Sequence, residues 1–515
     1  MASVFPHPQP FSPGTPDGTL LFVNSFRELP RDTNQARGIG EYAVEFLAHA
    51  TPSAAVLERT QMFFTDSVLC GLSALALETN APTILAAEAR EYLDSNGATL
   101  LGSADRVKAE KAIVANGSAV REWDSNGTNF GYRPERGWTA GEFGHNDFYS
   151  VPVAAAQESC LDGAAALLGM VLVDEIRGRL AEVFSLKSYR IDHVVHGAIA
   201  SAATYGALRG ATAEQIESAI GMFVAHHIPW RAIRAGKQLS DSKGASAAIS
   251  TEAAVLCMKR AMRGFIGPAD IFRNPESMFR QFQPTSGDSP FDLSLGWSGD
   301  DFAIQGMHLK LGLYEHQSAG AIQAVISMLA DPHLRQPGAI ERIIIRAYEP
   351  AFSIIGDPAK RDPKTRQSAD HSMAFIVART LKKAVVSDEN QWVKLWQDAM
   401  LLPEDYDDAA LQDPETRSWM DKIEFQHGGP EYDAKYPEGI PTSVDLITPD
   451  HTETSGLVMF PLGHARNNGN HLSEVLDTKW RRLSEIAGDP EGTFLSQLSQ
   501  LPKLTAPELL GIYSR

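Results

Sequence analysis

A long succession of helix-forming segments between Gly38 and Phe265 constrains the fold of this chain most strongly. Their apolar residues recur at helical spacing, and one run is rich in small residues that let helices approach closely. Glycine at position 210 is typical of a stop between two helices. These features predict an all-helical domain over residues 38–268. The predicted helical segments are Ser53–Ala76, Ala81–Leu93, Ala154–Phe184, Ile191–Leu208 and Thr212–Ala225.

The sequence after Gly264 changes character, because Pro and Gly become frequent and strand patterns appear. We predict an α+β domain over 269–465, preceded by an N-terminal arm at 1–37 and followed by a C-terminal helical segment, 466–515, that returns to the first domain. Residues Glu404–Ile440 are acidic and turn-rich and are predicted as surface loops. The predicted strands are Phe302–Leu313, Ile340–Tyr348, Thr442–Ile447 and Gly456–Pro461, with helices at Ser318–Leu329 and Asp370–Leu381.

Charge and composition exclude several classes of function. The formal net charge of −18 excludes a generally basic surface for nucleic acid or membranes. Apolar runs are far shorter than the roughly twenty residues that span a bilayer. The first 26 residues lack Arg and Lys and therefore lack the pattern of a transit peptide. We expect a cytoplasmic protein with reduced thiols and no metal cluster, because its cysteines are far apart: Cys70, Cys160 and Cys257.

The segment Trp230–Gly244 gathers cations in this acidic chain. Arg forms two-pronged hydrogen bonds to carboxylates, and Lys supplies a charge whose pKa can be tuned. An Ala-rich helix follows the segment, so the cations are expected at the mouth of a pocket for a small polyanion. A solvated loop with scattered charges is the alternative. The cations of the segment are Arg231, Arg234, Lys237 and Lys243, and Ser240 lies among them.

Three further stretches combine polar groups in unusual company. REWDSNGTN carries Asp124, Asn126 and Thr128, GEFGHND carries His145, and RIDHVVH carries His193 at the start of an apolar helix. Each also has an ordinary explanation, as a turn, an exposed loop histidine or a helix start. The last stretch has two histidines three residues apart, but no acidic or Cys partner at suitable spacing, so we predict no metal site.

Eight stretches in order along Asp66–Ser484 resemble the MmgE/PrpD family. They are ANGSAVREWDSNGT, EFGHND, IDHVVHGAIASA, WRAIRAGKQLSDSKGASAA, HLKLGLYEHQSAGAIQA, IERIIIRAYEPA, ADHSMAFIVA and PLGHARNNGN. The resemblance implies a mainly α fold, in which an α+β lid closes over a helical domain completed by the C-terminal helix. It also implies a small tricarboxylate substrate, no metal or organic cofactor, and a homodimer.

The resemblance also assigns residues to roles. The implied catalytic residues are Asp124, His145, His193 and Lys243, and the implied substrate-binding residues are Asn126, Thr128, Arg231, Arg234, Ser240, His316 and Gln317. The family's lid histidine falls at or next to Gln317, whereas this chain has His316. Two departures border the expected pocket: Gly127 replaces a second acid, and an insertion spans roughly Gly131–Gly137.

The expected reaction is the dehydration of 2-methylcitrate or a longer alkylcitrate to the unsaturated acid. Fixed cations would stabilise the negative charge that builds on a carboxylate, and an acid–base pair would move the protons. His145 and His193 are candidates for that pair, with Asp124 tuning one of them, and either could be the base. Related fungal proteins act in secondary metabolism on longer chains. Two alternatives stay open, a cis-aconitate-type decarboxylase and a non-catalytic tricarboxylate-binding protein.

Overall fold

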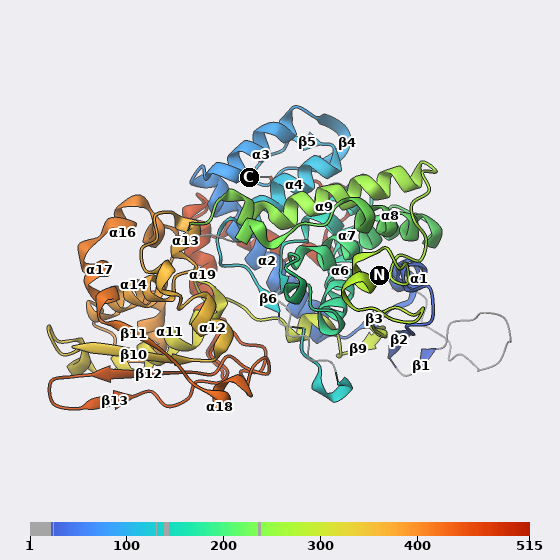
Figure 1. The fold of residues 1–515 in the computed structure, drawn as a ribbon. Coiled ribbons are helices and arrows are strands. Elements are labelled where there is room, and N and C mark those ends of the chain that lie inside the picture. Colours follow the sequence, from blue (N-terminus) through green and yellow to red (C-terminus); the bar gives the residue numbers. More distant parts are fainter. Residues whose placement is uncertain (1–21, 24, 130, 138–143, 235–237, 515) are drawn as a thin grey trace.

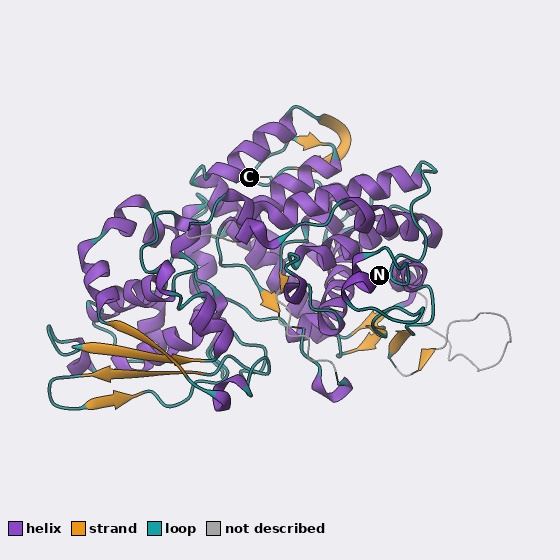
Figure 2. Cartoon of the chain, in the orientation of Figure 1, coloured by secondary structure: helices purple, strands orange, loops and turns teal. Residues whose placement is uncertain are grey.

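Helices dominate the computed structural model, which describes residues 22–23, 25–129, 131–137, 144–234 and 238–514. A large helical domain lies on the right of Figure 1 and a smaller α+β domain, the lid, on the left. Figure 2 shows the strands of the lid lying side by side in one sheet. The predicted fold class, mainly α with an α+β lid, is confirmed.

The helical domain is built around long helices with small, buried side chains. Helix α9 packs against both α4 and α7, and α6 packs against α7. Almost every residue of α7 is buried, and its glycines and alanines permit this close packing. The helices are α1 (Gln35–His49), α2 (Ala54–Ala76), α3 (Asn80–Arg90), α4 (Ala109–Glu122), α5 (Ser150–Glu158), α6 (Gly163–Val183), α7 (Val194–Leu208), α8 (Ala213–His226), α9 (Asp241–Met262) and α10 (Met278–Phe282).

The predicted run Ala154–Phe184 is two helices rather than one. Cys160 has a positive φ of 53° between α5 and α6, which breaks the first helix. Asp162 then caps the second, because its side chain accepts a hydrogen bond from the backbone N–H of Ala165 at 2.9 Å. Within the described ranges no single helix is long and apolar enough to cross a membrane. Helices α2 and α3 meet both conditions only as a pair, and that pair is bent by 89°.

Short strands complete the helical domain and move two predicted boundaries. Strand β8 pairs antiparallel with β2, and β9 pairs with β3, so the chain up to about Gly299 belongs to the helical domain and not to the lid. The described part of the predicted N-terminal arm is likewise part of this domain, through β2 and the start of α1. The strands are β1 (Phe22–Val23), β2 (Phe26–Leu29), β3 (Thr51–Pro52), β4 (Leu93–Thr99), β5 (Arg106–Val107), β6 (Thr128–Asn129), β7 (Gly144–His145), β8 (Leu293–Gly296) and β9 (Ser298–Gly299).

The lid is a four-stranded sheet in the order β11-β10-β12-β13 with helices packed on it. Strand β10 is central, parallel to β11 and antiparallel to β12, and its Ile343 and Ile345 are fully buried. Helix α11 packs on β12 and on α14. The strands are β10 (Arg342–Ala347), β11 (Ile423–His427), β12 (Thr442–Ile447) and β13 (Thr452–Thr454). The helices are α11 (Ala319–Leu329), α12 (Glu349–Ile354), α13 (Arg366–Ala369), α14 (Met373–Val385), α15 (Trp392–Ala399), α16 (Asp408–Gln412), α17 (Pro414–Asp421) and α18 (Pro430–Asp433).

Three predictions for the lid region are wrong. Phe302–Leu313 is not a strand: its first part, Ala303–Gly306, forms a 3₁₀ helix, and backbone N–H groups of Leu309 and Leu313 donate to loop carbonyls as the chain crosses between the domains. Gly456–Pro461 contributes only an isolated bridge at Val458 within the described chain. Glu404–Ile440 holds three helices and β11, because its apolar residues, Ile423 among them, complete the lid core.

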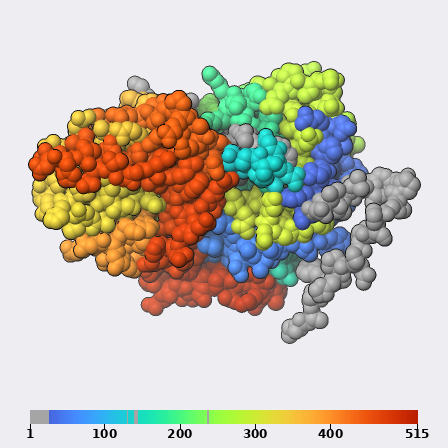
Figure 3. All heavy atoms as spheres, turned by 90° about the horizontal axis from the view of Figure 1, so that it is seen from below, coloured from blue at the N-terminus to red at the C-terminus, as the bar shows by residue number. Residues whose placement is uncertain are grey.

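The C-terminal segment crosses from the lid back to the helical domain (red in Figure 3). Helix α19 packs along α2, and the buried Nζ of Lys479 donates to Oδ1 of Asp66 on α2 at 2.7 Å. The same ammonium group donates to the carbonyl oxygens of Ser125 and Lys310. One side chain thereby joins the C-terminal helix to two segments of the candidate site. The C-terminal helices are α19 (Leu472–Ile486), α20 (Thr493–Leu498) and α21 (Ala506–Leu509).

Candidate active site

The site begins where α4 ends. Trp123 terminates this helix with extended backbone, and its indole N–H donates to Oγ of Ser73 at 2.9 Å, which anchors the following loop. Two residues of the hairpin formed by β6 and β7, Thr128 and His145, then pair across the strands. The hairpin therefore holds His145 beside the loop that carries Asp124.

The Asp124 carboxylate lies at the centre of a buried cluster of charged side chains. We call this cluster the ring of cations, because Arg121, Lys243 and Lys310 surround the carboxylate. Its Oδ2 is 3.3 Å from Nζ of Lys243 and 3.3 Å from Nη2 of Arg121, and its Oδ1 accepts a hydrogen bond from Nζ of Lys310. Burial would raise the pKa of this carboxyl group, but the surrounding cations hold the pKa well below its usual range. Asp124 is therefore ionised at neutral pH.

The lid supplies a second carboxylate to the same ring. Asp370 Oδ1 accepts a hydrogen bond from Lys243 at 3.0 Å, and its Oδ2 accepts one from Arg366 at 3.1 Å. Burial lowers the pKa of Lys243, although Asp370 and Asp124 both oppose that shift. Burial next to Asp124 raises the pKa of a neighbouring lid residue, Glu315, to about 7. The ring is therefore shared between the two domains.

His145 is held by an arginine. Nη2 of Arg121 lies 3.1 Å from Nε2 of His145, and because guanidinium groups only donate, this ring nitrogen is the acceptor. Burial first, and then the charge of Arg121, lowers the pKa of His145 well below its ordinary value. The ring is therefore neutral at pH 7, with its proton on Nδ1.

His193 belongs to an Arg–Asp–His chain of contacts. Asp192 Oδ1 lies 3.3 Å from Nδ1 of His193, and Oδ2 of Asp192 accepts a hydrogen bond from Nε of Arg234 at 2.5 Å. Burial lowers the pKa of His193 well below its ordinary value, while Asp192 opposes that shift. With Nδ1 directed at the carboxylate, Nε2 presents the lone pair, and this buried atom has no hydrogen-bond partner within the described part of the molecule. The His145 ring lies 5.4 Å away, centroid to centroid.

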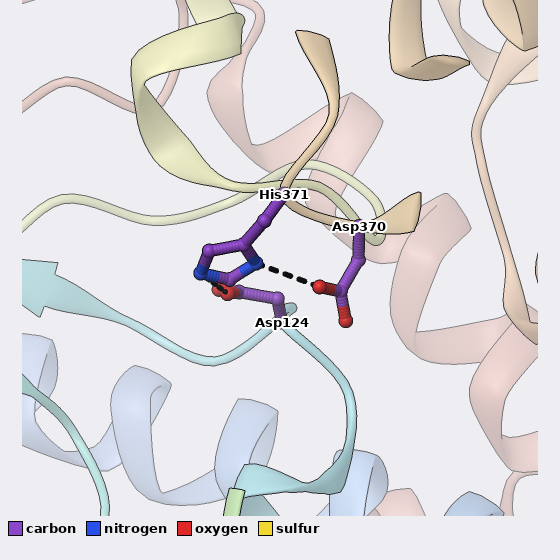
Figure 4. Close-up of side chains that lie close together, drawn as sticks. All are labelled: Asp124, Asp370 and His371. Atoms are coloured by element: carbon purple, nitrogen blue, oxygen red, sulfur yellow. Dashed lines mark hydrogen bonds and ion pairs between the residues drawn. The ribbon is translucent and has the colours of Figure 1, made fainter. Parts of the chain in front are cut away.

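Three side chains of the ring could offer ligand atoms to a metal ion. The ligand atoms of Asp124, Asp370 and His371 lie within 4.8 Å of one another. Figure 4 shows the three side chains close together. Nδ1 of His371, however, already contacts Asp370 at 2.7 Å. The carboxylates of Asp124 and Asp370 are both paired with lysine ammonium groups. Adjacent ammonium groups repel a divalent cation, so these residues do not fit a metal site.

The remaining predicted residues divide into supporting groups and groups at the edge of the site. Asn126 donates to Oδ1 of Asp147 at 2.6 Å and so supports the loop from below. His316 is buried in the lid, with its ring stacked 4.9 Å from that of His308, and Gln317 is buried beside it. The charges of Asp124 and Lys310 act on the pKa of His316, which burial lowers. His316 is therefore within electrostatic reach of the ring.

Only part of the predicted cation segment, Trp230–Gly244, belongs to the ring of cations around Asp124. Lys243 is at its centre, whereas Arg234 contacts Asp192 instead of facing an open pocket. Arg231 is partly exposed on the short 3₁₀ helix Arg231–Arg234, and its charge acts on Asp192 and His193. Ser240 is the exposed N-cap residue of α9. Lys237 lies outside the described residues.

Both departures noted in the sequence border this region. An ideal Cβ at Gly127 would lie 2.3 Å from Cε1 of Phe63, so the phenyl ring occupies the space that a second acid would need. The insertion forms a short turn at the surface between the lid and the helical domain (cyan in Figure 3), and Tyr132 contacts the guanidinium of Arg466. It lines a cavity of about 250 Å³ that His308 and His464 also line.

Sequence reasoning missed several members of the ring. Arg121, Lys310, Asp370 and His371 all lie in stretches that carried the resemblance, but none was singled out. Lys310 had the clearest signal, a lysine between two leucines in an apolar segment, because such a charge is rarely buried without a partner.

Family models and named proteins show what this chain is similar to. The MmgE/PrpD N-terminal domain matches residues 37–290, and the MmgE/PrpD C-terminal domain matches residues 314–390. A 2-methylcitrate dehydratase of Escherichia coli O157:H7 is 24% identical over 432 residues, which is 80% of this chain and 83% of that protein. The mitochondrial 2-methylcitrate dehydratase of Yarrowia lipolytica is 24% identical over 453 residues, 84% and 81% of the two chains. An alkylcitrate dehydratase, phiI, of Fungal sp. is 27% identical over 208 residues, 40% of each chain.

Proposed function

Because the chain belongs to the MmgE/PrpD family, we propose that it is a hydro-lyase that removes water from a citrate-type tricarboxylate. The proposed substrate is 2-methylcitrate or a longer alkylcitrate, and the product is the corresponding unsaturated acid. The observation that carries the proposal is the buried Nε2 of His193, which has no hydrogen-bond partner among the described residues and lies next to the ring of cations. A base beside fixed positive charge is what abstraction of a weakly acidic C–H proton requires.

The cations around Asp124 would bind the substrate carboxylates. Arg121, Lys243 and Lys310 converge on one carboxylate, so the same donors can grip carboxylates of a ligand. Their burial strengthens each electrostatic contact, because little water is present to screen it. They would also stabilise the negative charge that develops when the neighbouring carbon loses its proton.

His193 would act as the base. Asp192 fixes the ring with Nδ1 towards the carboxylate, and the lowered pKa keeps Nε2 unprotonated at neutral pH. Arg234 holds Asp192 through two contacts, at 2.5 and 3.3 Å, and is therefore a positioning residue in this proposal rather than a substrate ligand. This assignment replaces the role predicted for Arg234 from the sequence.

Lys243 would donate the proton to the leaving hydroxyl group. Its lowered pKa makes the ammonium group a stronger acid than an exposed lysine, whereas both His145 and His193 have pKa values too low to be protonated at neutral pH. In the elimination, Nε2 of His193 takes the proton from carbon, the C–O bond breaks, and the hydroxyl leaves as water with the proton from Lys243. Arg121 holds the His145 ring beside that of His193.

A substrate panel tests the proposed function. Purified protein is incubated separately with 2-methylcitrate, alkylcitrates of increasing chain length, and cis-aconitate, and the products are identified by mass spectrometry. Loss of water from a citrate homologue supports the proposal and gives the preferred chain length. Loss of carbon dioxide from cis-aconitate would assign the decarboxylase activity instead, and tight binding without turnover of any acid would indicate a non-catalytic binding protein.

A further inference from the structure

A second cavity lies in the helical domain, away from the ring of cations. It has a volume of about 490 Å³ and is formed by the start of α4, the end of α7 and the end of α9. Tyr205, Leu256 and Met262 give it an apolar wall. A cavity of this size is in the range of small-molecule sites in proteins, roughly 300–1,000 Å³.

Two of the acidic groups that line this cavity are neutralised by groups within it. Nζ of Lys259 donates to Oε2 of Glu110 at 2.5 Å and to Oε1 of Glu158 at 3.3 Å. Glu158 is also 3.5 Å from Nε of Arg209 and accepts a hydrogen bond from the hydroxyl of Tyr205. This network therefore offers no free carboxylate to attract a cation into the cavity.

Three further cations line the same cavity and are not paired with carboxylates of the described residues. Lys108, Arg260 and Arg263 are exposed, and no carboxylate lies within 4.0 Å of their charged groups in the described part of the chain. Asp94 is the only other acid among the lining residues, and its Oδ1 accepts a hydrogen bond from the backbone N–H of Asn96. A surplus of positive charge in a chain of net charge −18 is a local feature that attracts anions.

We propose that this cavity binds a small organic molecule with two or more negative groups, carboxylate or phosphate. Lys108, Arg260 and Arg263 would bind the anionic groups at the rim, and the wall formed by Tyr205, Leu256 and Met262 would contact the apolar part. Guanidinium groups suit both anions, because their paired donors match two oxygens.

The proposed site is separate from the candidate active site. Lys243 lies in the first turn of α9 and Lys259 in its last turn. A rise of 1.5 Å per residue over these sixteen positions separates them by about 24 Å. Occupancy of one cavity therefore does not block the other directly, and the proposal stands whether or not the proposed dehydratase activity is found.

Calorimetric titration with two probes tests the proposal. Inorganic pyrophosphate represents the phosphate class and succinate the carboxylate class, each titrated into the full chain at low and high salt. At least one probe should bind to the wild type, more weakly at high salt, and the double variant R260A/R263A should bind it at least tenfold more weakly. Whichever probe binds more tightly identifies the anion class.

Two control variants show whether the probe binds at the proposed site. The double variant R481A/R482A removes two exposed arginines from α19 and should bind the probe as the wild type does. Lys243→Ala, at the far end of α9, should also retain this binding, which separates it from any binding in the candidate active site. The proposal is overturned if neither probe binds to the wild type, or if R260A/R263A binds as tightly as the wild type.

Discussion

The ammonium group of Lys243, in the helical domain, donates to Oδ1 of Asp370, in the lid, at 3.0 Å. The contact is buried, and Lys243 also lies 3.3 Å from Asp124. The central cation of the candidate site is thus held between one carboxylate from each domain. An anionic substrate would compete for this ammonium group, so binding would change the electrostatic tie between lid and helical domain.

Lys479→Met should lower the free energy of unfolding by about 3–5 kcal/mol, because it leaves the buried Asp66 carboxylate without its cation. Denaturant unfolding followed by circular dichroism measures the change. Lys394→Met removes an exposed lysine of α15 that pairs with Glu474 of α19, the helix that carries Lys479, and it should alter the unfolding midpoint little. Equal effects of the two variants would refute the structural role of Lys479.

Much of the fold could be predicted from the sequence, because helical and strand periodicity is strong where one face is buried. The predictions for α2 and β12 agree with the structure to within a residue. The strand prediction for Phe302–Leu313 failed because most of this segment is buried as it crosses between the domains, so its alternation does not reflect one exposed face. The pairing of β8 with β2 could not be predicted, because a contact between residues so distant in sequence leaves no local signal.

Acid should destabilise the protein through its buried histidines. Burial lowers the pKa of His196 to about 4, so below its ordinary pKa the unfolded chain binds a proton that the folded chain does not. Stability is therefore lost as the pH falls from about 6.5 towards 4, by about 2 kcal/mol between about pH 7 and about pH 5 for this residue. Unfolding midpoints of the wild type and His196→Gln across that range measure it. A wild-type slope that His196→Gln leaves unchanged would contradict the prediction.

Gly127→Ala should destabilise the protein by about 1–3 kcal/mol, because the new methyl group would meet the ring of Phe63. Thermal unfolding of the single variant and of the double variant Gly127→Ala/Phe63→Leu tests the cause. The two changes should partly compensate each other in a double-mutant cycle. Simple additivity of the two effects would show that the Phe63 ring is not what excludes a side chain at position 127.

Arg234 and Arg231 should respond differently to replacement by Met. Because Arg234 contacts Asp192 and not an open pocket, Arg234→Met should lower kcat by tenfold or more with little change in KM. Arg231→Met, at a partly exposed position whose charge reaches His193, should mainly raise KM. Steady-state kinetics with the preferred citrate homologue separates the two. A higher KM with unchanged kcat in Arg234→Met would return Arg234 to the role of substrate ligand.

The candidate site was predicted in part. The resemblance pointed to Asp124, His145, His193 and Lys243, and the structure brings these four side chains together. The lid's contribution could not be predicted, because Lys310 and Asp370 reach Asp124 and Lys243 only through tertiary contacts across the domain boundary. The sequence also cannot tell a cation that faces a ligand from one that faces a neighbouring carboxylate, as Arg234 does with Asp192.

Turnover by His193→Asn, compared with His196→Asn three residues along the same segment, tests the central claim most directly. His196 faces the carbonyl oxygen of Phe184 at 2.9 Å and serves as the matched buried control. If His193 is the base, His193→Asn should lower kcat for dehydration by about 10²–10⁴-fold while His196→Asn stays within a few-fold of the wild type. Near-normal turnover by folded His193→Asn would contradict the account.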